Sequence, residues 1–217
     1  MKYKCLVWDH DDTVVNSTAM VHYPCFREYM DKLNLNTDIT LEDYFRYNFD
    51  PGVTRFFKEI CGQTDEQIKV EQEYWKEYAS KRVSDAFPGI REIMERQRAD
   101  GGILAVVSHS FASNILKDYR HNNLPIPDEI FGWEQPPEER KPAPHSLYVL
   151  MEKYNLQPKD ILVIDDLKPG LDMAVAAGCD FAACQWCYKI PEIRSYMLEH
   201  ATYCCDTVED LAELIKL

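Results

Sequence analysis

The stretch CLVWDHDDT, residues 5–13, is an apolar run that ends directly in a cluster of acids. A short run of apolar residues is typical of a strand that is buried on both faces, and the abrupt change in polarity marks the end of that strand. Further apolar runs occupy residues 103–107, 129–131, 161–164, 181–186 and 202–205. Helical-period segments lie between the later runs, at residues 113–121, 145–154 and 170–177. This alternation predicts an α/β fold with a parallel sheet.

The interval between the first two predicted strands is unusually long. It contains no convincing strand and shows four amphipathic helical segments, at residues 20–33, 41–49, 52–61 and 64–82. Thr40 and Thr64 are candidate N-caps, because a threonine hydroxyl can accept from a free first-turn amide. An ordinary crossover needs only about a dozen residues. We therefore predict an α/β core formed by residues 1–15 and 87–217, and an inserted all-α domain formed by residues 16–86.

The overall charge limits the partners that the protein can take. The chain has 217 residues, with 24 basic against 37 acidic side chains and a net charge of −13. Such a surface repels polyphosphates at long range, so we expect neither a nucleic-acid nor a membrane partner. No apolar stretch approaches the roughly 18 residues of a membrane span, and the first run is too short for a signal peptide. We therefore expect a cytoplasmic protein with a small-molecule partner, as a monomer or a homodimer.

The eight cysteines include the pair Cys184 and Cys187, spaced as CxxC, and the adjacent Cys204 and Cys205. A structural zinc site prefers two spaced pairs, so the spacing does not favour zinc. We expect Cys184, Cys204 and Cys205 to be small apolar residues on strands.

Polar side chains follow three of the predicted strands directly. They lie at residues 9–13, 108–110 and 165–166. In open α/β sheets, sites form outside the carboxyl ends of the strands, so these side chains are expected at one edge. Clustered carboxylates repel one another unless a cation lies among them, and an all-oxygen ligand set favours Mg²⁺. Lys141, in a proline-rich loop, could add the positive charge that a bound phosphate needs.

In their order along the chain, these segments resemble the motifs of the haloacid dehalogenase superfamily. The similar segments are DxDxT at residues 9–13, Ser108, Lys141 with Pro142, and the acidic pair Asp165-Asp166 followed by Gly170. Residues 16–86 fall where this family carries its helical C1 cap. The pattern is most similar to that of phosphoglycolate-phosphatase-like and β-phosphoglucomutase-like members. The resemblance implies a Rossmann-like parallel-sheet core with an inserted all-α cap domain.

The resemblance also implies an activity, namely a Mg²⁺-dependent phosphatase that hydrolyses a small phosphorylated metabolite through an aspartyl phosphate. By the same resemblance, Asp9 is the nucleophile and Asp11 is the general acid and base. Ser108 and Lys141 would bind the phosphoryl oxygens. The implied Mg²⁺ ligands are the Asp9 carboxylate, the Asp11 backbone carbonyl and Asp166, with Asp165 as a direct or supporting ligand.

Two residues depart from the family pattern: Asp12 stands where glycine is usual, and Leu167 where serine is frequent. Neither change removes a catalytic group. Asp11 favours phosphate esters, because the dehalogenases of the family lack an acid there. His22 and Arg55 in the insertion, and His109 beside Ser108, are candidate substrate contacts. A solvated surface role stays open for Arg55.

Two other functions stay open. A sugar phosphomutase would use the same chemistry, although His22 falls one residue later than the mutase pattern requires. A receiver-like signalling domain also gathers aspartates, a hydroxyl and a lysine on a parallel sheet, and it is phosphorylated on aspartate. Its acceptor lies on the third strand, however, and no long helical insertion follows its first strand.

Overall fold

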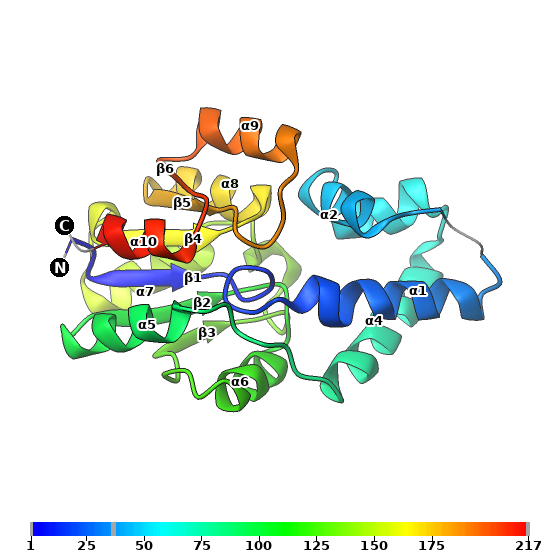
Figure 1. Cartoon of the computed structure of the whole chain (residues 1–217), viewed down its shortest axis with the longest axis horizontal. Helices are drawn as coiled ribbons and strands as arrows, with labels where there is room; N and C mark the ends of the chain where they lie inside the picture. The colour runs from blue at the N-terminus through cyan, green and yellow to red at the C-terminus, as the bar shows by residue number, and fades with distance from the viewer. Residues whose placement is uncertain (1, 36–37, 216–217) are drawn as a thin grey trace. The chain divides into compact units, whose positions relative to one another are not determined.

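The computed structural model describes residues 2–35 and 38–215. The chain divides into two compact units, one formed by residues 1–16 with 85–217 and the other by residues 17–84. Figure 1 shows the strands gathered in the first of these units.

The first unit contains a sheet of six parallel strands (Figure 1). The strands are β1 Cys5–Trp8, β2 Ile103–Val107, β3 Glu129–Phe131, β4 Ile161–Asp165, β5 Asp180–Cys184 and β6 Tyr203–Cys205. Their spatial order is β3-β2-β1-β4-β5-β6, which is the Rossmann order, with the switch point between β1 and β4. The predicted parallel α/β fold is therefore confirmed. In such sheets a ligand binds at the carboxyl ends beside the switch point, and residue 9 follows β1 there.

Two strand ends differ from the sequence prediction. The strand predicted at residues 181–186 is β5, which ends at Cys184, so the prediction was wrong for its last two residues. Trp186 lies beyond the strand, and its indole N–H donates to the backbone oxygen of Thr13 at 3.1 Å, which directs this segment toward the loop after β1. β4 runs one residue further than predicted and includes Asp165.

Helices cover the sheet of the first unit. They are α5 Ile90–Ala99, α6 Ala112–His121, α7 His145–Tyr154, α8 Lys168–Ala177, α9 Pro191–His200 and α10 Val208–Ile215, with short 3₁₀ turns η3 Pro137–Glu139 and η4 Pro158–Asp160. Ile93 of α5, Ile115 of α6 and Leu211 of α10 share one buried apolar cluster with Leu6 and Trp8 of β1. Alternate residues of a strand face opposite sides, so these three helices cover the same face of the sheet.

The second unit is helical, and residues 17–35 and 38–84 include no strand. Its elements are η1 Thr18–His22, α1 Tyr23–Lys32, α2 Leu41–Phe49, α3 Val53–Arg55, η2 Phe56–Ile60 and α4 Asp65–Ser80. Both predicted N-caps are confirmed, since the hydroxyls of Thr40 and Thr64 accept from the backbone N–H three residues on. The single helix predicted at residues 52–61 is instead divided into α3 and the π-helical η2. Aromatic rings fill the interior of this unit, among them Phe26, Tyr44 and Phe56.

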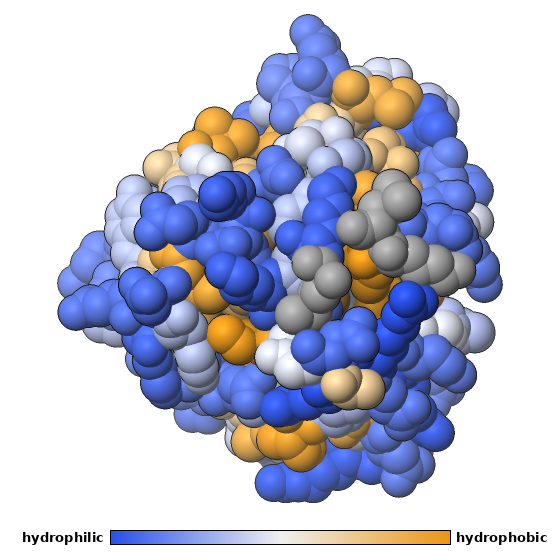
Figure 2. All heavy atoms as spheres, turned by 90° about the vertical axis from the view of Figure 1, so that its left-hand side faces the viewer, coloured by the Kyte–Doolittle hydropathy of each residue, from blue (hydrophilic) through white to orange (hydrophobic). Residues whose placement is uncertain are grey.

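Figure 2 shows hydrophilic residues over most of the visible surface, with hydrophobic residues in small separated areas. Within the described part of the chain, no helix combines the length and the apolar character that a membrane crossing requires.

Candidate active site

The loop that follows β1 carries the first acids of the site. Asp9 extends the parallel ladder by one residue, since its N–H donates to the oxygen of Ile164 at 2.8 Å. The loop then turns back at Asp12, whose φ of 60° lies in the left-handed region. Aspartate tolerates this conformation better than most residues do. This explains how Asp12 can stand where the family usually has glycine.

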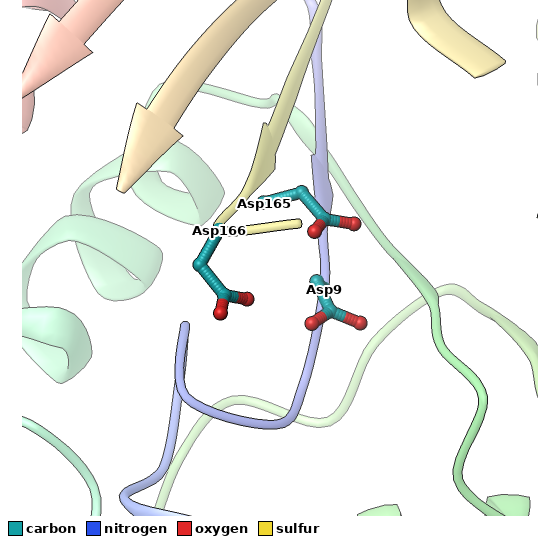
Figure 3. Close-up of side chains that lie close together, drawn as sticks. All are labelled: Asp9, Asp165 and Asp166. Carbon is teal, nitrogen blue, oxygen red and sulfur yellow. The ribbon is translucent and has the colours of Figure 1, made fainter. Parts of the chain in front are cut away.

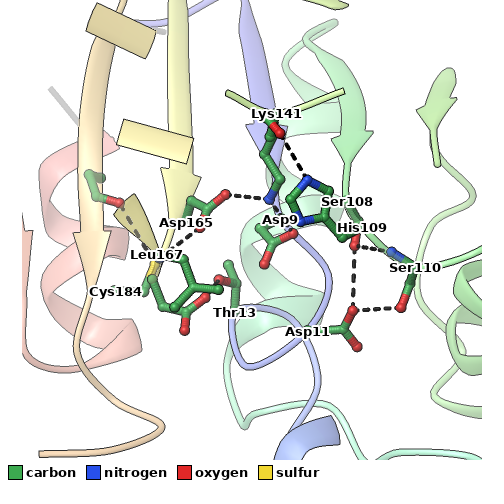
Figure 4. Close-up of polar contacts among 12 residues, drawn as sticks. Asp9, Asp11, Thr13, Ser108, His109, Ser110, Lys141, Asp165, Leu167 and Cys184 are labelled. Atoms are coloured by element: carbon green, nitrogen blue, oxygen red, sulfur yellow. Dashed lines mark hydrogen bonds and ion pairs between the residues drawn. The ribbon is translucent and has the colours of Figure 1, made fainter. Parts of the chain in front are cut away.

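Three acids and one lysine meet at the carboxyl ends of β1 and β4. The side chains of Asp9, Asp165 and Asp166 converge there (Figure 3), and one oxygen of each lies within 4.8 Å of the others. Lys141 Nζ lies 2.8 Å from Asp9 Oδ1 and 2.7 Å from Asp165 Oδ2 (Figure 4). All four side chains are buried. The sheet therefore brings together acids that are more than 150 residues apart in the sequence.

The charges of this cluster are not balanced. Burial raises the pKa of Asp9 to about 7, with Lys141 opposing the shift and Asp165 and Asp11 adding to it. Burial also raises the pKa of Asp166 well above its ordinary value, as do Asp165 and its other carboxylate neighbours. Burial alone would lower the pKa of Lys141, but Asp165 and Asp9 outweigh that effect and raise it. One lysine among several buried acids leaves room for a further positive charge.

Asp165 and Asp166 have different surroundings. Asp165 uses both oxygens, because Oδ2 accepts from Lys141 and Oδ1 accepts from the Leu167 N–H at 2.8 Å. A Cβ atom on Gly170 would lie 2.1 Å from Asp165 Oδ2, so this acid requires glycine in the first turn of α8. Asp166 accepts from the Thr13 hydroxyl at 3.3 Å. Asp165 is thus occupied with holding Lys141, whereas Asp166 faces the loop after β1.

Asp11 contacts the segment that follows β2. The Ser110 hydroxyl donates to Asp11 Oδ2 at 2.6 Å, and the Ser108 hydroxyl lies 3.5 Å from the same oxygen (Figure 4). The Ser110 N–H donates to Ser108 Oγ at 3.1 Å, which joins the two serines. Sequence reasoning missed Ser110 as a partner of Asp11. The one sequence feature that pointed to Ser110 was its place in the polar tripeptide after β2. Ser108 lies in the same tripeptide, so this feature could not distinguish the two serines.

The three candidate substrate contacts lie in different surroundings. His109 Nε2 lies 3.0 Å from the Lys141 backbone oxygen, and its ring meets Trp133 edge-on. Burial and the charge of Lys141 lower the pKa of His109 to about 4, so it is neutral at pH 7. His22 and Arg55 belong to the second unit. His22 Nδ1 accepts from the Trp75 indole at 2.8 Å, and Arg55 pairs with Glu59 at 2.7 Å.

Comparison with known proteins gives the family. Residues 6–184 match the model of the haloacid dehalogenase-like hydrolases, so the chain belongs to that family, as its motifs implied. It is 30% identical over 169 residues to a phosphoglycolate phosphatase of Mannheimia succiniciproducens. The aligned region covers 74% of this chain and 71% of that protein.

Solved structures agree with this fold. A protein from Bacteroides fragilis assigned to the haloacid dehalogenase-like hydrolases superposes with a TM-score of 0.82 and 22% identity, over 97% of this chain and 100% of that one. A Thermotoga maritima protein assigned as a β-phosphoglucomutase gives a TM-score of 0.70 and 19% identity, over 99% of each chain. At these identities the likeness shows the fold alone.

Proposed function

We propose that the chain is a Mg²⁺-dependent phosphatase that hydrolyses a small phosphorylated metabolite through an aspartyl phosphate on Asp9. The observation that carries the proposal is Lys141, held between Asp9 and Asp165 inside a buried group of carboxylates. The relative from Mannheimia succiniciproducens, named a phosphoglycolate phosphatase, supports the same reaction class.

The donor set of the site fits Mg²⁺. Asp9 and Asp166 would hold the ion with their carboxylates, together with the backbone carbonyl of Asp11. Asp165 fits a supporting role better, because both of its oxygens already accept hydrogen bonds. A hard cation prefers such oxygen ligands, and it keeps positions for phosphate and water. When bound, Mg²⁺ supplies the positive charge that lets an anionic ester approach this acidic site.

The residues of the chain then divide the reaction between them. The Asp9 carboxylate attacks phosphorus, the bond from phosphorus to the ester oxygen breaks, and Asp11 gives its proton to the leaving alcohol. Asp11 next takes a proton from water, which attacks the same phosphorus, and this step releases phosphate and restores Asp9. Lys141 and Ser108 bind the transferring oxygens. Asp165 keeps the Lys141 ammonium in place, so its charge needs no reorganisation during the reaction.

We further propose that the insertion, residues 16–86, is the cap domain of the enzyme and that residues 1–15 and 87–217 are its catalytic core. Closure of such a domain over the site would exclude bulk water from the phosphoenzyme. His22 and Arg55 are the candidates through which the cap would contact the substrate. The partner in this proposal is a small phosphate ester. The net charge of −13 argues against nucleic acid.

Hydrolysis of p-nitrophenyl phosphate in Mg²⁺, followed by a panel of phosphorylated metabolites compared by kcat/KM, tests the proposal. We expect turnover that stops on addition of EDTA and returns with excess Mg²⁺. A folded protein that hydrolyses no phosphate ester would contradict it. Transfer from a bisphosphate to a sugar phosphate would instead indicate the mutase, and a long-lived phosphoprotein without turnover would indicate the receiver-like domain.

A further inference from the structure

His10 lies between the two aspartates of the proposed mechanism, and the mechanism does not use it. Its ring is almost completely buried, at 1% exposure, and Nε2 lies 3.2 Å from Oδ2 of Asp118 in α6. Asp118 is buried as well. A carboxylate oxygen accepts hydrogen bonds, so the tautomer of His10 that fits this contact carries its proton on Nε2 and donates it to Asp118. The ring also stacks on Tyr119, with ring centroids 5.9 Å apart.

The His10–Asp118 pair gives this buried position no clear advantage in stability over apolar side chains. Among residues 2–35 and 38–215, His10 Nδ1 has no hydrogen-bond partner, so Asp118 is the polar contact that orients the ring. A buried unpaired nitrogen costs stability, and a buried polar pair is often no more stable than apolar side chains of similar volume. A leucine could pack on the Tyr119 ring in place of the imidazole. The pair therefore calls for a role other than stability.

The pair joins two segments that both carry residues of the site. Asp9 and Asp11 flank His10 in the loop after β1. Asp118 lies in α6, which begins at Ala112, two residues after Ser110. The Asp11–Ser110 hydrogen bond of 2.6 Å joins the same two segments. The His10–Asp118 bond therefore gives the loop a second connection to α6, and this connection does not involve a reacting carboxylate.

We propose that His10 is a positioning residue, whose hydrogen bond to Asp118 anchors the loop of residues 9–13 to α6 and thereby fixes the carboxylates of Asp9 and Asp11 for reaction. The inference rests on the proposed function, because it takes those two carboxylates as the reacting groups. A displacement of about 1 Å at a reacting group can cost about 100-fold in rate. The anchor therefore acts on kcat more than on KM.

The test compares kcat and KM for p-nitrophenyl phosphate at saturating Mg²⁺ among wild type, His10→Leu, His10→Gln and Asp118→Leu. We expect His10→Leu and Asp118→Leu each to lower kcat about tenfold or more, with KM changed by less than about threefold. His10→Gln should restore most of the rate, because its amide N–H can reach Asp118. The double leucine variant should lose no more than either single variant, since one contact is removed in both.

A matched control separates positioning from general loss of stability. Ile115, three residues before Asp118 in the same helix, is fully buried in the apolar core and adds no polar group to the His10–Asp118 contact. Ile115→Ala should lower the melting temperature and leave kcat within about twofold, provided that the assay runs well below that temperature. If His10→Leu fails to fold, a comparison of Asp118→Asn with Asp118→Leu tests the role of the hydrogen bond instead. The asparagine oxygen still accepts the bond, so only the leucine variant should lose rate.

A readout that does not depend on activity is the imidazole N–H proton of His10 in the NMR spectrum. We expect a slowly exchanging resonance in the wild type that is lost in Asp118→Leu. Suppose that the wild type is active and Asp9→Asn is not. A folded His10→Leu variant with kcat within about twofold of wild type would then overturn the role of His10 and leave the proposed function standing. A wild type that is inactive on every phosphate ester would instead overturn the proposed function.

Discussion

The carboxyl edge of the sheet and the helical unit of residues 17–84 hold their charged side chains in different ways. At the sheet edge, Lys141 lies between two buried aspartates from different strands, so the contact exists only when the sheet has formed. In the helical unit, Arg55 pairs with Glu59 four residues along the chain, and both side chains are largely exposed. A pair of that kind needs only one helical turn. The charged contact at the sheet edge is therefore specified by the fold, whereas the Arg55–Glu59 contact is specified by one turn of helix.

Apart from loss of the proposed nucleophile itself, loss of metal is the largest effect that this contrast predicts. Removing Mg²⁺ with EDTA should lower phosphatase activity by about 100-fold or more, because the buried acids then repel the ester. Asp166→Asn should raise the Mg²⁺ concentration for half-maximal rate by about tenfold or more. Asp172, an exposed acid of α8, provides the matched control, and Asp172→Asn should leave that concentration unchanged. Equal effects of both variants would place the metal elsewhere.

Among residues 17–35 and 38–84, the one buried acid is Glu71, and it should affect stability and not chemistry. Burial raises the pKa of Glu71 from 4.5 to about 7, and His22 partly opposes the shift. Because the folded state binds this proton more tightly, stability should fall as the pH rises from about 4.5 to about 7. A pKa shift of this size lowers the free energy of unfolding by about 3 kcal/mol once the pH is above that window.

Glu71→Gln should remove this pH dependence. Urea unfolding at pH 8 should show the variant to be more stable than wild type, with the difference vanishing near pH 4.5. Glu73→Gln, an exposed neighbour on α4, serves as the control and should change little at either pH. A Glu71→Gln variant less stable than wild type at pH 8 would show that the charged carboxylate is stabilised by the fold.

A smaller change is expected for Ser110→Ala at the sheet edge. The variant removes the hydroxyl that donates to Asp11 at 2.6 Å, so the carboxylate that we propose as the general acid loses a fixed orientation. We expect kcat to fall about tenfold, with less change in KM. Ser113→Ala, at an exposed position of α6, should keep the wild-type rate. If both serine variants behave alike, the Ser110 contact does not serve the reaction.

Some residues of the site could be predicted from the sequence, and some of their contacts could not. Asp9, Ser108 and Asp165 could be placed from the sequence, because each follows an apolar run and parallel strands end at one edge of a sheet. The partnership of Ser110 with Asp11 could not be predicted, nor could that of His10 with Asp118. Both depend on where the chain turns beyond a strand and on how α6 packs, and neither carries a periodic signal.

The helical unit shows a different limit. Its helices and both threonine caps could be predicted, because periodicity and capping are local signals. The pairing of the His22 ring with Trp75, 53 residues further on, was not predictable from spacing. The division of residues 52–61 into α3 and η2 was missed as well, because an apolar pattern does not distinguish an α-helical turn from a π-helical one.

The smallest effect is expected at Arg55. Arg55→Ala removes an exposed ion pair with Glu59, so the free energy of unfolding should change by less than about 1 kcal/mol. The same measurement on Glu59→Gln should give a similar small value. A fall in kcat/KM for Arg55→Ala alone, at unchanged stability, would assign Arg55 to substrate binding and bring the helical unit into the chemistry.

The most direct test of the central claim is the rate of Mg²⁺-dependent hydrolysis by Asp9→Asn, measured beside wild type on p-nitrophenyl phosphate. An amide of the same shape cannot take the phosphoryl group, so we predict a loss of about 1,000-fold or more in kcat with the fold intact by circular dichroism. A folded Asp9→Asn variant that keeps its rate within about tenfold of wild type would contradict the assignment of Asp9 as the nucleophile.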